Sequence, residues 1–139
     1  MLPVRAGALG AAVLVVAVAL AVRATASGGF AKYTGDALYT VLLHTLVVAV
    51  APRVRPLAAA SLALGVSWAV EFAQLTPIPA ELSARSGLAR LVLGSTFNAP
   101  DLFWYAVGAA ASFAAHRAVV RRRGSDGARL SGAYPDRPL

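Results

Sequence analysis

Apolar residues fall into four long segments along this chain, separated by short stretches of polar, glycine and proline residues. The segments cover 6–22, 37–51, 57–75 and 99–120. A bilayer core of about 30 Å needs about 20 helical residues, within a range of about 17–25. The third and fourth segments meet this length, the first is marginal, and the second is short unless it begins at Gly35. Because lipid cannot satisfy an open backbone, the pattern predicts an all-α integral membrane bundle of four transmembrane helices.

The connections between these segments differ in length and composition. Residues 27–29 read Ser-Gly-Gly, and residues 52–56 form a tight basic hairpin with a proline at each end. Prolines at these places end one helix and start the next. The third connection, 76–98, is long and mixes Arg85 and Arg90 with leucines and a valine. We expect it to be either an interfacial helix or a re-entrant segment.

The first apolar segment and the C-terminal residues each have a further distinctive composition. Arg5, the first apolar run and the Ala-Thr-Ala of 24–26 together resemble a cleavable signal peptide. Arg23 lies between that run and the cleavage-like site, which favours an uncleaved first helix. We therefore expect one transmembrane domain over 1–123. The glycine-, serine- and arginine-rich residues 124–139 are expected to form a disordered basic cytoplasmic tail.

Composition agrees with a membrane protein. Hydrophobic residues make up 58% of the chain and charged residues 14%, and mean hydropathy is +0.67. A typical soluble domain has about 45–50% apolar and about 25% charged residues. The chain has no cysteine, which excludes a disulfide framework and a thiolate metal site or nucleophile.

The net charge of +7 comes from arginines that flank the apolar segments. Cytoplasmic flanks of membrane helices carry such charge, so Arg53, Arg55 and the run 121–123 predict that both chain ends are cytoplasmic. Basic residues after the fourth helix are also compatible with anionic lipid headgroups. No aromatic residue interleaves with the basic run, so nucleic acid is not an expected partner.

Polar residues inside the apolar segments follow helical spacing. Residues three, four, seven or eight apart share a helix face. Such a stripe occurs in each of the last three segments. In the second it consists of Asp36, Tyr39, Thr40 and His44. In the third it consists of Ser67, Glu71 and Gln74, and in the fourth of Asp101, Tyr105, Gly108 and Ser112. With both chain ends inside, the three carboxylates gather near the outer face, and the stripes are expected to face one another because lipid cannot satisfy them.

Each carboxylate also has a structural explanation. Asp36 and Asp101 stand at expected helix starts, where an acid caps free amides and complements the helix dipole. Glu71 lies within an apolar helix, and an ion pair with Arg85 or Arg90 would anchor the outer connection.

Other polar or small residues also have structural interpretations. Gln74 suits an interhelical hydrogen bond, and His44 suits a satisfied interior histidine more than a metal ligand. Gly108 and Ser112 form a small-xxx-small pair for close helix contact. No metal-ligand motif is present, and neither a metal nor a cofactor is expected.

The stretches KYTGDALYT, EFAQL and ARLVLGSTFNAPDLFWYAVG resemble an uncharacterised bacterial membrane family, the domain of unknown function 2809. They are also similar, more distantly, to VanZ-like proteins. That resemblance assigns Glu71 and Gln74 to a Glu-x-x-Gln element, Arg85 (or Arg90) to an arginine element, and Asp101, Tyr105 and Gly108 to a last element. Tyr105 replaces the asparagine of the VanZ-like pattern. The resemblance implies a helical membrane fold and a site, and it supplies no reaction.

Three functions remain open from the sequence. The first is an outer-facing pocket in the bacterial inner membrane that binds a lipid or lipid-linked envelope precursor, with one set of ligand-binding residues: Asp36, Glu71, Gln74, Arg85, Arg90, Asp101, Tyr105. The second is a structural or accessory subunit of a larger membrane complex or a homo-oligomer. The third is a lipid-modifying enzyme in which Glu71 and Asp101 exchange protons and Arg85 stabilises negative charge.

Overall fold

The computed structural model describes residues 1–132 and contains only α-helices over that range. They are, in chain order, α1 Leu2–Thr25, α2 Gly28–Val50, α3 Pro56–Ala73, α4 Ile78–Arg85, α5 Gly87–Leu93 and α6 Ala99–Gly132. The expected all-α class is therefore confirmed. Helix α2 begins well before residue 37, so the segment that looked short from its apolar residues alone has 23 helical residues.

Three of the described helices are long and apolar enough to cross a membrane. Over their most apolar 18 residues, mean hydropathy is 2.2 in α1, 1.3 in α2 and 1.4 in α3. Helix α6 was expected as a fourth span and does not reach this level within the described residues. Its apolar stretch is interrupted by polar side chains, among them Tyr105, His116 and Arg117.

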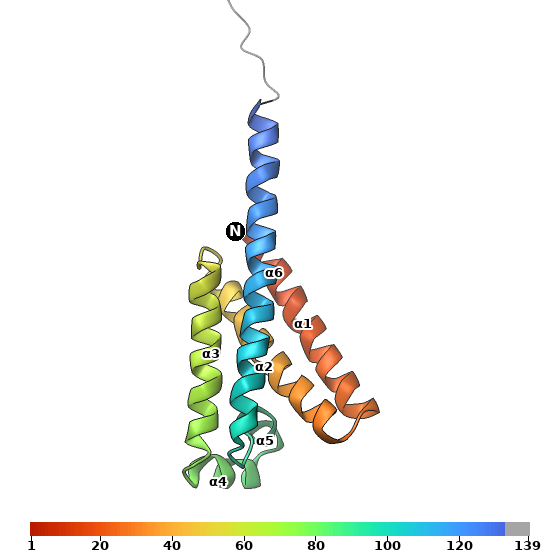
Figure 1. The fold of residues 1–139 in the computed structure, drawn as a ribbon, viewed down its shortest axis with the longest axis vertical. Helices are drawn as coiled ribbons and strands as arrows, with labels where there is room; N and C mark the ends of the chain where they lie inside the picture. The colour runs from red at the N-terminus through yellow and green to blue at the C-terminus, as the bar shows by residue number, and fades with distance from the viewer. Residues whose placement is uncertain (133–139) are drawn as a thin grey trace, which may run out of the picture.

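The core consists of α2, α3 and α6, each of which packs against the other two, while α1 lies along α2. Figure 1 shows α3 and α6 running side by side and α1 leaning away from them. The short helices α4 and α5 pack on each other at the end of the bundle where α3 stops and α6 starts. The long connection between α3 and α6 is therefore a two-helix cap on that end.

Small residues allow the core helices to approach closely. Ala59 and Ala63 of α3 are fully buried, and Ala109 of α6 is nearly so. At Gly108 a Cβ would lie 2.2 Å from the carbonyl oxygen of Ala37, so only glycine fits this contact between α2 and α6. Such contacts are how membrane helices associate without a hydrophobic driving force.

Helix α6 continues past the bundle. Figure 1 shows it projecting beyond the start of α1 and the α2–α3 turn. The expected disordered tail was to begin at residue 124, but the chain stays helical to Gly132. Arginine, alanine and leucine are good helix formers, so the helix can continue there despite Gly124 and Gly127 in its interior. The remaining residues of the expected tail, 133–139, lie outside the described part of the chain.

Candidate functional site: a pocket with a charged floor

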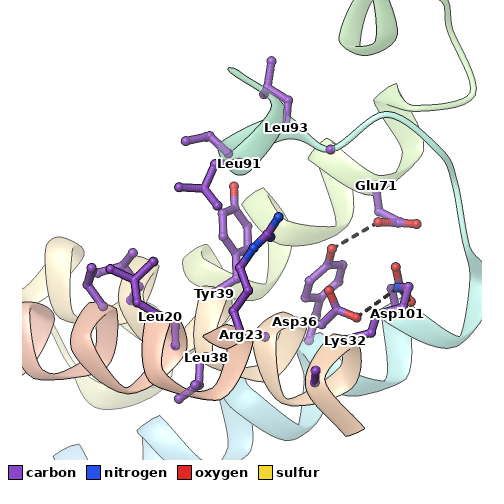
Figure 2. A pocket seen from close by; sticks show the side chains of 18 of the residues that line it. Leu20, Arg23, Lys32, Asp36, Leu38, Tyr39, Glu71, Leu91, Leu93 and Asp101 are labelled. Carbon is purple, nitrogen blue, oxygen red and sulfur yellow. Dashed lines mark hydrogen bonds and ion pairs between the residues drawn. The ribbon is translucent and has the colours of Figure 1, made fainter. Parts of the chain in front are cut away.

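A pocket of about 570 Å³ lies at the capped end of the bundle. Its floor is polar and comes from α2, α3 and α6, which contribute Lys32, Asp36, Glu71 and Asp101, among others. Its walls are mainly apolar and come from α1, α2 and the α5 region, including Leu20, Leu38 and Leu91. Figure 2 shows these charged groups gathered at one side, with leucines on the others. The pocket is therefore amphipathic.

Lys32 connects two carboxylates from different helices. Its ammonium lies 3.3 Å from Oδ2 of Asp36, one turn along α2, and also donates to Oδ1 of Asp101 on α6. Asp101 is 4% exposed and accepts a second hydrogen bond from the side-chain amide of Asn98. Asp101 also lies in the first turn of α6, where a negative charge complements the helix dipole. This cluster ties the start of α2 to the start of α6.

Glu71 is completely buried, with both carboxylate oxygens in hydrogen bonds. The backbone N–H of Asn98 donates to Oε1 at 2.6 Å, and the Tyr105 hydroxyl donates to Oε2 at 3.1 Å. The expected ion pair with Arg85 or Arg90 is not formed, because every ion pair among the described residues belongs to Lys32. Glu71 therefore holds the end of α3 to the start of α6 through neutral donors.

The two arginines of the connection lie away from the pocket. Arg85 is exposed, and its side chain makes no hydrogen bond within residues 1–132. Arg90 donates to the carbonyl oxygen of Ser83 at 3.2 Å, while the Ser83 hydroxyl donates to the carbonyl of Gly94 at 2.7 Å. Both bonds hold α4 and α5 together, so the positive charge inside the pocket comes from other residues.

Gln74 fastens the cap to α3. Its Nε2 donates to the Leu93 carbonyl at 2.6 Å, and its Oε1 is buried without a partner in the described chain. Gly94 adopts a φ of 64°, which favours glycine, and a Cβ there would lie 2.7 Å from Gln74 Nε2. A glycine at this position therefore makes room for the glutamine side chain, whose free acceptor lies at the pocket.

Two further polar layers lie deeper in the bundle. Thr40 of α2 and Ser67 of α3 share a hydrogen bond of 2.8 Å, and both are fully buried. His44 Nε2 lies 3.1 Å from Nδ1 of His116 on α6, while His44 Nδ1 is buried without a partner. Among the described residues, no group of three or more His, Cys, Asp or Glu side chains could hold a metal ion.

The structure thus brings together the three stripes predicted from helical spacing. Asp36, Glu71, Gln74, Asp101 and Tyr105 all line the pocket. Arg85 and Arg90 do not line it. Sequence reasoning did not identify three contributors as site residues: Arg23, Lys32 and Asn98. The Lys-x-x-x-Asp spacing of Lys32 and Asp36 was a usable signal, whereas Arg23 and Asn98 carried none without the fold.

Fold and site together define a small helical protein with three candidate membrane spans and an amphipathic pocket at one end. The chain belongs to the family described as "Protein of unknown function (DUF2809)", whose model matches residues 25–109. This range runs from the end of α1 to the first third of α6 and includes all four charged residues named above for the pocket floor. No curated protein and no solved structure matches the chain.

Proposed function

We propose that this protein is an integral membrane protein that binds the polar head of a lipid or lipid-linked envelope precursor in its pocket. The observation that carries the proposal is the pocket's division into a charged floor and apolar walls. A membrane amphiphile has the same division. Its head would meet the floor at the membrane surface, and its chain would lie along the apolar residues of α1 and α5.

Topology supports access from the outer face. The start of α1 and the α2–α3 turn lie together, at the end of the bundle opposite the cap. That end carries Arg5, Arg53 and Arg55, and the last part of α6, whose sequence includes the run 121–123 of three arginines, projects beyond it. Following the positive-inside rule, we propose that this end is cytoplasmic, that α6 is a fourth span, that both chain ends are inside and that the pocket is outside. A bacterial inner membrane and a distant VanZ-like relationship are parts of the same proposal.

The burial of Glu71 favours a second candidate, a structural or accessory subunit. A carboxylate that is 0% exposed, with a hydrogen bond to each oxygen, stabilises the helix contacts whether or not a ligand binds. The same geometry gives little support to an enzyme in which Glu71 transfers a proton, because both of its oxygens are already in hydrogen bonds within the protein. Substitution of Glu71 therefore tests the stability of the fold, and ligand binding in the pocket has to be tested with a different variant.

A bulky side chain introduced into the pocket distinguishes lipid binding from a purely structural role. Ala19 of α1 lines the pocket, whereas Ala17 on the same helix is exposed and does not. Native mass spectrometry of the purified protein should show a bound lipid on the wild type and on Ala17→Trp, and none on Ala19→Trp. If Ala19→Trp folds and keeps the same adduct, or if no form carries any lipid, the pocket is not the binding site.

A second pocket-filling variant guards against misfolding of the first. Gly35 of α2 lines the pocket, and a Cβ there would meet nothing within 4 Å. Gly35→Leu should therefore fit without moving the helices and should also displace the lipid. An unchanged adduct on this variant would count against the proposal even if Ala19→Trp could not be purified.

A further inference from the structure

The charges that line the pocket do not cancel locally. Lys32 lies between Asp36 and Asp101, so this group of three keeps one formal negative charge. Arg23 at the end of α1 also lines the pocket and forms no ion pair among the described residues. Figure 2 shows the Arg23 side chain reaching into the pocket beside Tyr39 and Asp36. Apart from Glu71, whose two oxygens are hydrogen-bonded within the protein, the pocket therefore presents one residual positive and one residual negative charge that do not pair with each other.

The pocket also contains hydrogen-bonding groups without partners in the described chain. Asp36 uses only Oδ2 for Lys32, at 3.3 Å, and Gln74 Oε1 is buried without a donor. Both residues line the pocket, and the unused oxygen of Asp36 adds an acceptor at the negative charge. The Tyr39 hydroxyl makes no hydrogen bond within the described chain, and Figure 2 shows it beside Arg23. Arg23 and Tyr39 are thus donors on the positive side.

Arg23 is exposed and Asp36 is partly buried, so a ligand can reach both residues, and one that pairs with both charges is favoured. Arginine donates charge-assisted, often bidentate hydrogen bonds to phosphate, and a carboxylate accepts them from an ammonium group. Building on the proposed function, we propose that the pocket selects a zwitterionic head, a phosphate ester that carries a primary amine. The phosphate lies at Arg23 and Tyr39, and the amine lies at Asp36.

This head occurs in an aminophospholipid and in an amine-bearing lipid-linked precursor. Both sources share the chemistry that the pocket recognises. The mass of a lipid that co-purifies with the wild-type protein distinguishes them. A co-purified lipid that lacks either the phosphate or the primary amine would overturn the inference.

A lipid panel tests the two halves of the head separately. The probes are phosphatidylethanolamine, phosphatidylcholine, phosphatidylglycerol and diacylglycerol with matched chains, each titrated onto delipidated full-length protein in native mass spectrometry. The ethanolamine lipid should bind about ten-fold more tightly than the choline lipid, which has no N–H donors, and than the glycerol lipid, which has no cation. Equal binding of all three phospholipids would overturn the inference but leave the proposed function standing. If no lipid in the panel binds and none co-purifies with the wild-type protein, both fail.

Two variants test which residues bind the phosphate and which bind the amine of the head. Asp36→Asn should abolish the preference for ethanolamine over choline and retain the preference for phospholipids over diacylglycerol. Arg23→Gln should retain the preference for ethanolamine over choline and abolish the preference for phospholipids over diacylglycerol. Arg85→Gln is the matched control, since Arg85 is exposed and lies outside the pocket. If either pocket variant behaves like Arg85→Gln, the assignment is wrong; the wild-type ranking tests the inference even if a variant does not fold.

Discussion

Replacing Gly108 with alanine tests how closely α2 and α6 pack. The added Cβ would lie 2.2 Å from the carbonyl oxygen of Ala37 and 2.9 Å from its carbonyl carbon. A carbon–oxygen contact is relaxed at about 3.3–3.6 Å, so the two helices must separate locally by about 1 Å. The clash involves backbone, which cannot rotate away as a flexible side chain can.

The expected loss of stability in Gly108→Ala is compared with that of the same substitution at a matched glycine. Overpacking of a tight contact costs about 1–3 kcal/mol. Alanine also gains up to about 1 kcal/mol over glycine in a helix interior, which partly offsets the clash. Gly65 of α3 is exposed, and a Cβ there meets nothing within 4 Å. Gly65→Ala has the propensity gain without the clash, so the difference between the two variants is about 1–3 kcal/mol.

Intrinsic fluorescence during denaturant unfolding in detergent micelles measures this difference. Trp104 of α6 stacks on Tyr33 of α2 with ring centroids 5.4 Å apart, so its emission reports on the same helix pair. Gly108→Ala should unfold at lower denaturant than Gly65→Ala, with an altered native emission. Equal midpoints and equal native spectra would refute the close approach of α2 and α6.

Two further substitutions test the buried hydrogen bonds. Tyr105→Phe removes the donor to Glu71 Oε2 and leaves a buried carboxylate oxygen unsatisfied, at a cost of about 1–3 kcal/mol in unfolding free energy. Thr40→Val keeps the side-chain shape but removes the bond to Ser67 that joins α2 and α3, and should cost about 0.6 kcal/mol and at most about 1.7 kcal/mol. Both are measured by the same unfolding experiment.

Each of these variants has a control in a neighbouring residue. Tyr33→Phe removes a hydroxyl that makes no hydrogen bond within residues 1–132, and should change stability little. Thr45→Val removes a bond to Leu42 within one helix, so it leaves the contact between α2 and α3 intact. If Tyr105→Phe matches its control, Glu71 does not depend on that hydroxyl. If Thr45→Val costs as much as Thr40→Val, the bond between helices adds nothing.

The sequence by itself determined the helical class, the apolar segments and the alignment of polar stripes. These are local properties: hydropathy over about 20 residues selects membrane helices, and a period of 3.6 residues places Asp36, Thr40 and His44 on one face. The resemblance to the domain of unknown function 2809 was confirmed by the match over residues 25–109. Helix ends were less determined, since both α2 and α6 extend beyond their apolar residues.

Only the tertiary structure decided which groups pair. Glu71 was expected to meet Arg85 or Arg90, nearby in sequence, but it bonds to Asn98 and Tyr105 across the α3–α6 contact. Sequence separation does not show which backbone N–H or hydroxyl a folded chain brings to a buried oxygen. In the same way, Arg23 reaches the pocket because α1 folds back along α2, a long-range contact that no local pattern encodes.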